Sequence, residues 1–324
     1  MAQITAAMVK QLREMTDSPM MECKKALVEA EGDMEAAVDI LRKNGLAAAA
    51  KKAGRDTNEG AVAAYISEDG TKGALAEIAC ETDFVASNPK FTGFAAEVAQ
   101  VVCDNEPADV DALLALDMNG ETVEAALTEM IHVIGENMKI SRTAVRKPAA
   151  GGVASYIHMG GKIGVLVEFA FEKAETASAE AFKTFAHDVA MQVAATAPIA
   201  AVREDVDQDV IDHEVAIYKA QAAESGKPEA IQEKMAVGRL EKFFKGIVLN
   251  EQEFIKDSSM TIKAYAEKVS KELGDNVKVV ASIVWSAASK LTHSMRAGRG
   301  VQPHGPAFFM CNAGRVCAGV DNPG

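Results

Sequence analysis

The chain has 324 residues, of which 48% are hydrophobic and only 5% aromatic, so it is long enough to bury the cores of two or more domains. Its formal net charge of -13 at pH 7 argues against direct nucleic acid binding, because phosphate contacts need clustered Lys and Arg. We therefore expect protein partners and no nucleic acid ligand.

Membrane insertion and secretion are also disfavoured by the sequence. It has no apolar run of roughly 18 residues, and Glu14, Asp17 and Glu22 interrupt the region where a signal peptide would be apolar. The cysteines form no Cys-x-x-Cys pair; they are Cys23, Cys80, Cys103, Cys311 and Cys317. We expect reduced thiols in a cytoplasmic protein, without a zinc site and without a membrane anchor.

The pattern of residues 1–50 predicts an N-terminal module of three short helices. Apolar residues at helical spacing mark the first helix, and Ser18 with Pro19 predicts the start of a second helix that runs to about Ala30. Asp33 is expected to cap the third helix and Gly45 to end it. Residues 51–59 then form a polar linker.

An internal repeat organises the centre of the chain. Residues 60–78 align without gaps to residues 151–169, and nine of the nineteen positions are identical. Alternating residues in each copy predict a β-hairpin, with Asp69-Gly70 in the first and Gly160-Gly161 in the second supplying the turn with positive φ.

Helix-forming sequence follows each hairpin and predicts an α+β fold with two related subdomains. The helical regions are roughly 90–135 and 175–197, and residues 138–147 are expected to add a third strand to the first sheet. The predicted subdomains span residues 60–148 and 149–284. A strand over 277–284 closes the second of them.

Residues 206–250 predict a protruding arm of two antiparallel helices, broken by a Ser-Gly-Lys-Pro turn at residues 225–228. From Trp285 to Gly324 the sequence is basic, rich in glycine and without periodicity. We expect this atypical tail to be disordered, and translation from a shifted reading frame is the alternative.

Motifs for enzymatic chemistry are incomplete. A phosphate-binding P-loop fails at Gly226-Lys227, where Pro228 follows, and at Gly161-Lys162, where Ile163 follows. His213-Glu214 lacks the second histidine of a zinc helix, because Ile217 stands in its place. A nucleotide-hydrolysing enzyme is therefore disfavoured, and we expect no cofactor.

Thr82-Asp83-Phe84-Val85 follows the end of a predicted apolar strand and places an acid beside a large aromatic ring. The second copy has no equivalent, since Lys173-Ala174-Glu175-Thr176 occupies those positions. A fold requirement would occur in both copies, which favours a contact function. The alternative is that Phe84 packs against the next helix and Asp83 only caps that helix.

Three features together resemble elongation factor Ts over about residues 2–284. They are the Thr82-Asp83-Phe84-Val85 motif, the helix at residues 20–27 (MMECKKAL) and the repeated hairpins. The resemblance implies a guanine-nucleotide exchange factor for the GTPase elongation factor Tu. It also implies that the N-terminal module has a fold similar to ubiquitin-associated domains.

The same resemblance assigns the binding residues. Asp83 and Phe84 would enter the partner near its magnesium and phosphate site, with Thr82 and Val85 beside them. Lys24 would dock on the same GTPase domain, and His158 of the second hairpin would reach another domain. Ile255 matches a further contact region, although the neighbouring Lys256 departs from the apolar residue often found there.

The resemblance ends before the C-terminal tail. The family's acidic C-terminal stretch and short helix are replaced here by the basic tail, so we expect weaker binding than for a full-length member. A structural adaptor that joins protein partners is the alternative function, and a homodimer is left open.

Overall fold

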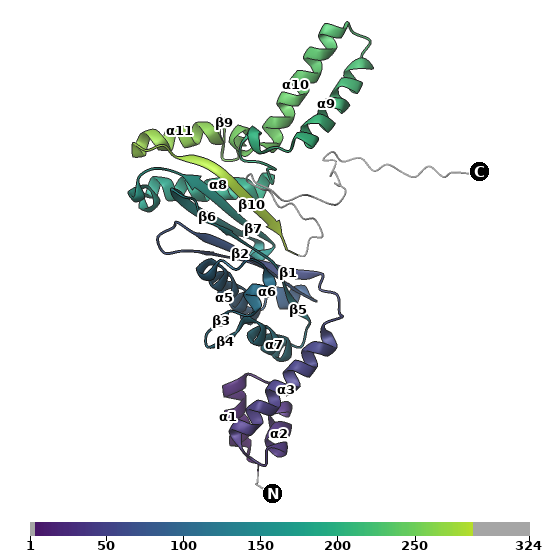
Figure 1. Cartoon of the computed structure of the whole chain (residues 1–324), viewed down its shortest axis with the longest axis vertical. Coiled ribbons are helices and arrows are strands. Elements are labelled where there is room, and N and C mark those ends of the chain that lie inside the picture. The colour runs from purple at the N-terminus through teal and green to yellow at the C-terminus, as the bar shows by residue number, and fades with distance from the viewer. Residues whose placement is uncertain (1–3, 288–324) are drawn as a thin grey trace, which may run out of the picture.

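The computed structural model describes residues 4–287, beginning with a three-helix module at one end of an elongated molecule (Figure 1). The side chains of Thr5 and Asp33 accept hydrogen bonds from backbone N–H groups and so cap the first and third helices. The three helices are α1 (Ala6–Thr16), α2 (Met20–Glu29) and α3 (Met34–Lys52). The predicted stop at Gly45 is wrong. The helix continues because its alanine-rich end is a good helix former and Gly45 packs against His132 of the core.

The first repeat forms an antiparallel sheet with strand order β1-β2-β5, as the predicted hairpin and third strand require. Gly70 adopts a φ of 69° in the hairpin loop, where a side chain would be strained. The strands are β1 (Glu59–Ile66), β2 (Gly73–Cys80) and β5 (Met138–Arg146).

One face of this sheet packs on helices. The apolar side of α5 contributes Phe91, Phe94 and Val98 to a core that also contains Ile78 and Ile140 of the sheet. The two-residue strands β3 and β4 interrupt the region predicted to be helical, because Gly120 turns the chain there. The elements are α4 (Asp83–Ala86), α5 (Pro89–Asn105), α6 (Val110–Leu114), β3 (Asp117–Met118), β4 (Glu121–Thr122) and α7 (Val123–Ile134).

The second repeat forms another antiparallel sheet, with strand order β10-β7-β6. Gly160 and Gly161 have φ values of 64° and 101° in the hairpin turn, as predicted. Phe169 and Phe185 meet edge to face in the core beneath this sheet, with ring centroids 5.7 Å apart. The main elements are β6 (Gly151–His158), β7 (Ile163–Ala170), α8 (Glu180–Thr196), β8 (Glu253–Phe254), β9 (Asp257–Thr261), α11 (Ile262–Leu273) and β10 (Lys278–Ser286).

The two sheets pack face to face, with helices on their outer sides, so the core has four layers (Figure 1). Val62 and Leu75 of the first sheet meet Val153 and Leu166 of the second. Gly164 lies at the closest approach, because a Cβ atom there would stand 2.8 Å from the Cβ of Val62. Gly73 occupies the same position in the first copy as Gly164 in the second. The lack of a side chain at Gly164 therefore lets the two copies pack against each other.

We expect Gly164→Ala to lower the free energy of unfolding by about 1–3 kcal/mol, because the added methyl group would push the sheets apart. Gly238→Ala is the matched control, since a Cβ added there would meet no other part of the chain within 4 Å and alanine favours its helix. Urea unfolding followed by circular dichroism measures both. Equal stability of the two variants would contradict the close packing.

The predicted start of the tail at Trp285 is wrong. The closing strand β10 runs to Ser286, and Trp285 is only 5% exposed between the sheets. The guanidinium of Arg142, on β5, lies 4.4 Å from the centroid of the Trp285 ring. The sequence change at Trp285 therefore does not coincide with the end of the fold. The remainder of the predicted tail, residues 288–324, lies outside the described residues.

The predicted arm consists of α9 (Gln208–Ala223) and α10 (Glu229–Ile247), which pack against each other and project from the second sheet's side (Figure 1). Arg203 joins the base of the arm to the body, because its guanidinium pairs with both Glu241 and Glu251. Within residues 4–287, no helix combines the length and the hydropathy needed to cross a bilayer.

Candidate functional site

The segment after β2 forms a tight projection that we call the tip, residues 82–87. Thr82 caps the one-turn helix α4 by accepting a hydrogen bond from the N–H of Val85 at 3.4 Å. Asn88 then caps α5, accepting from the N–H of Lys90 at 2.9 Å, and Pro89 occupies the first turn of that helix. Two consecutive caps thus fix the path of the chain through the tip.

Phe84 is the most prominent apolar group of the tip, with 83% of its surface exposed. The alternative in which it packs against α5 is therefore wrong. Asp83 is also exposed and does not cap α5, a role that Asn88 fills. Val85 points the other way and is only 8% exposed, in the core beneath the first sheet. The acid and the ring are left free to contact another molecule.

A carboxylate from a distant part of the chain supports the tip. Glu136 accepts hydrogen bonds from the backbone N–H of Thr82 at 3.0 Å and from its hydroxyl at 2.7 Å. It lies 54 residues further along the chain, just after α7. No local sequence pattern links Glu136 to Thr82, so this contact was not predicted from the sequence. The only signal was Gly135, which ends α7 with a φ of 90°.

Cys80 ends β2 directly before the tip and is fully buried. Its thiol donates to the carbonyl oxygen of Thr82 at 3.2 Å. Burial, with the nearby Glu136 carboxylate, raises the pKa of the Cys80 thiol to about 12. Since the thiolate is the nucleophile, Cys80 acts as a core residue and not as a catalytic one.

We expect Cys80 to react with iodoacetamide at pH 8 about a thousandfold more slowly in the native chain than in the urea-unfolded chain. The reason is that a pKa near 12 leaves very little thiolate at this pH. Mass spectrometry of the Cys80 peptide separates its labelling from that of other cysteines. Comparable rates in both states would contradict the assignment.

The face of α2 that carries Lys24 is the second candidate surface. Lys24 is exposed, and Met20, Met21 and Val28 lie three or four residues away from it and are exposed as well. Helical spacing of this kind forms one stripe on the helix. The resemblance predicted Lys24, whereas the exposed apolar stripe around it was not predicted from the sequence. An exposed row of large apolar residues was the signal available for it.

The other two candidate residues lie on the second subdomain. His158 is exposed at the end of β6, where its Nδ1 lies 3.1 Å from the hydroxyl of Tyr156. Ile255 is 45% exposed in the turn between β8 and β9. Its N–H donates to Gln192, and the neighbouring Lys256 pairs with Asp188 at 2.7 Å.

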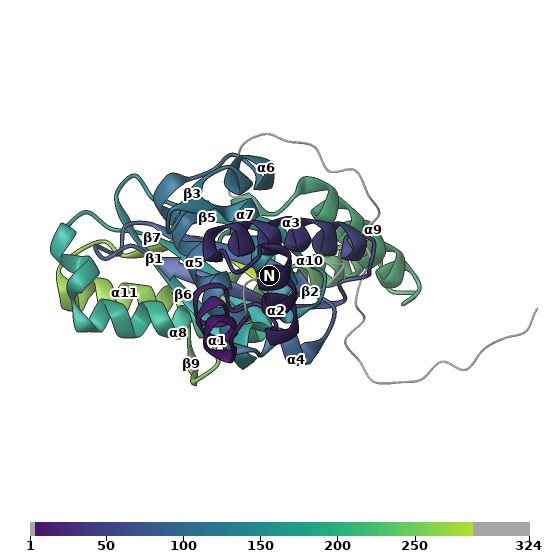
Figure 2. The same cartoon turned by 90° about the horizontal axis from the view of Figure 1, so that it is seen from below.

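The candidate residues do not converge on one pocket. In Figure 2, α1, α2, α4 and β9 lie toward the same side of the molecule. In that view the tip and α2 are therefore on the same side of the molecule. His158 and Ile255 belong to separate elements and make no shared cluster with the tip.

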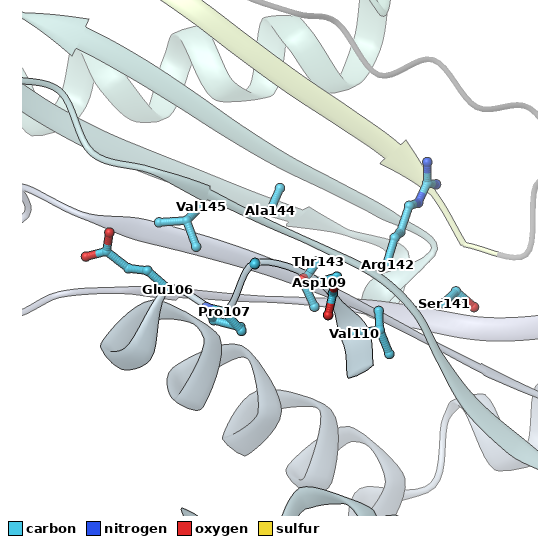
Figure 3. Close-up of a pocket in the computed structure, with 10 residues that line it drawn as sticks. Glu106, Pro107, Asp109, Val110, Ser141, Arg142, Thr143, Ala144 and Val145 are labelled. Atoms are coloured by element: carbon cyan, nitrogen blue, oxygen red, sulfur yellow. The ribbon is translucent and has the colours of Figure 1, made fainter. Parts of the chain in front are cut away.

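A hollow of about 410 Å³ lies elsewhere, between β5 and the loop that joins α5 to α6 (Figure 3). Glu106 and Asp109 line it, and the side chain of Arg142 points away from the loop (Figure 3). Hydrogen bonds from Lys147 and Lys72 hold the pKa of Glu106 below its usual range. Tip residues are absent from the lining, so this hollow is separate from the candidate surface.

Comparisons with known proteins agree on one family. The family model described as elongation factor TS matches residues 81–287. Elongation factor Ts of Trichlorobacter lovleyi is 49% identical over 277 residues, covering 85% of this chain and 89% of the relative. Elongation factor Ts of Clostridium perfringens is 48% identical over 277 residues, covering 85% and 90%. With the tip, the paired sheets and the helical arm in place, the chain belongs to the elongation factor Ts family.

Proposed function

We propose that this chain promotes GDP release from elongation factor Tu by inserting Asp83 and Phe84 near the magnesium and phosphate site of that GTPase. Family membership carries the exchange role itself, in which GTP can bind after GDP has left and no covalent bond is made or broken by the factor. It also decides against the adaptor hypothesis. The observation that supports the tip is the 83% exposure of Phe84 on a capped turn.

The mechanism is one of differential binding. An exchange protein that binds the nucleotide-free GTPase more tightly than the GDP-bound form must, by reciprocal linkage, weaken the affinity of the GTPase for GDP by the same ratio. A large apolar side chain held outside the fold suits this task, because it gains apolar contacts only when the partner opens to receive it. Phe84 meets that requirement, and the Asp83 carboxylate beside it adds a polar contact.

The remaining candidate residues complete the proposed interface. Lys24 and the methionines of α2 dock on the same GTPase domain as the tip, while His158 and Ile255 reach further surfaces of the partner. Thr82 and Val85 act from within, since Thr82 caps α4 and Val85 anchors it in the core. We place this activity in the cytoplasm, where translation takes place.

Magnesium dependence tests the proposed target of the tip. If Phe84 acts by disturbing the magnesium site, chelating Mg²⁺ with EDTA removes in advance the interaction that Phe84 would otherwise weaken. The fold-acceleration of fluorescent GDP release by this chain should then be much smaller with EDTA than with excess Mg²⁺. The same fold-acceleration in both conditions would contradict action at the magnesium site. For the Phe84→Ala variant, measured in parallel, the fold-acceleration of GDP release should be similar with EDTA and with excess Mg²⁺.

A further inference from the structure

The tip is too short to hold its own shape. Helix α4 has only four residues, and the first turn of a helix costs more conformational entropy than its hydrogen bonds return. Phe84 itself, being largely exposed, makes little contact that could fix its direction. Its orientation therefore depends on contacts of the residues on either side of it, of which Val85 is anchored in the core.

Glu136 supplies this support through both polar donors of Thr82. Its two carboxylate oxygens accept separately from the N–H at 3.0 Å and from the hydroxyl at 2.7 Å. Hydrogen bonds to a charged acceptor are stronger than neutral ones. Because the hydroxyl proton points to Glu136, the oxygen lone pairs are left to accept the N–H of Val85. The carboxylate thus selects the rotamer in which Thr82 caps α4.

The turn that carries Glu136 is itself tied down by the next residue. The N–H of Asn137 donates to Glu81 at 2.6 Å, so the segments 81–82 and 136–137 are joined by hydrogen bonds in both directions. The side-chain amide of Asn137, which is buried, donates to the carbonyl of Arg55 at 2.8 Å. Arg55 lies in the linker from the N-terminal module. The turn at residues 136–137 therefore connects the tip to the segment that leads from α3.

We propose that Glu136 is a positioning residue for nucleotide exchange, which holds Thr82 so that α4 presents Phe84 in the direction that enters the partner. This inference rests on the proposed role of Phe84. It acts by preorganisation: the free chain already has the bound orientation, so less conformational entropy is lost when the partner binds. Glu136 need not touch the partner to have this effect.

The test uses stopped-flow release of fluorescent GDP from elongation factor Tu at concentrations of each variant well below saturation, where the release rate depends on how tightly the variant binds. Glu136→Ala should lower this rate about tenfold, as expected from losing hydrogen bonds to a charged group. Glu136→Gln should recover most of the rate, because its amide can accept from the Thr82 N–H and donate to the hydroxyl oxygen. Glu124→Ala, at an exposed position of the preceding helix α7, is the matched control and should remain within about twofold of the parent.

A double-mutant cycle separates positioning from general destabilisation. In a chain that already carries Phe84→Ala, Glu136→Ala should cause no further loss, because there is no ring left to orient. An equal loss in both backgrounds would overturn the proposal, and so would a rate for Glu136→Ala within about twofold of the parent. If Glu136→Ala unfolds, Thr82→Val removes the same hydroxyl contact at nearly constant volume and replaces it in the cycle.

These outcomes differ from a failure of the exchange function. If the unmodified chain does not accelerate GDP release, the exchange function fails and the cycle is not reached. If the unmodified chain is active and Phe84→Ala is slow while Glu136→Ala is fast, only the positioning role is wrong.

Discussion

Replacing Phe84 by alanine is expected to slow the stimulated release of GDP from elongation factor Tu by about 30-fold. Truncating an aromatic interface anchor typically costs about 2 kcal/mol or more, and 1.4 kcal/mol corresponds to a factor of ten. The free chain should lose almost no stability, because 83% of the ring surface is exposed before the partner binds. A large functional loss without a structural one is the signature of a contact residue.

Val237→Ala is a suitable control for this variant. Val237 is also a large exposed apolar residue, at 60%, but it lies on the arm helix α10. Release stimulated by this control should match that of the parent chain. Thermal unfolding of all three proteins checks that they are equally folded. A Phe84→Ala chain as fast as the parent would show that exchange proceeds without the ring.

Trp285→Ala is expected to lower the free energy of unfolding by about 3–5 kcal/mol, the usual cost of truncating a buried tryptophan. The ring is 5% exposed and fills the space between the two sheets, where it packs with Leu166 and Ile283. Its loss also removes the cation–π contact of Arg142. The variant should therefore loosen the contact between the two subdomains as well as the strand itself.

Urea unfolding followed by circular dichroism measures the loss in the free energy of unfolding. This signal, unlike tryptophan fluorescence, can be followed in a variant that lacks Trp285. Lys278→Ala, at an exposed position in the same strand, serves as the control and should change stability by less than about 0.5 kcal/mol. If Trp285→Ala were as stable as this control, Trp285 would belong to the tail, as its sequence context indicates, and not to the core.

Local patterns were sufficient to predict most of the architecture. The repeat at residues 60–78 and 151–169 predicted both hairpins, and the turn at residues 225–228 predicted the arm. The hairpins and the arm are determined by residues that lie close together in the sequence. The strand position of Trp285 could not be predicted, because packing against distant elements overrides composition there. At the end of α3, the alanine-rich sequence outweighs the stop signal of Gly45.

In the candidate site, too, local features could be predicted from the sequence and long-range contacts could not. The motif at residues 82–85 identified the tip, but periodicity alone could not decide whether Phe84 is exposed or packed, since both arrangements place an apolar residue after a strand. Glu136 could not be found at all, because its contact with Thr82 spans 54 residues and depends on how α7 returns to the first sheet. Groups that orient a site from far along the chain need a structure to be recognised.

The most direct test of the central claim is the rate of fluorescent GDP release from purified elongation factor Tu, with and without this chain, in excess unlabelled nucleotide and Mg²⁺. We expect catalytic amounts of the chain to accelerate release, at a rate that rises with its concentration to a plateau. A release rate that stays at the spontaneous value at every concentration of the folded chain would contradict it.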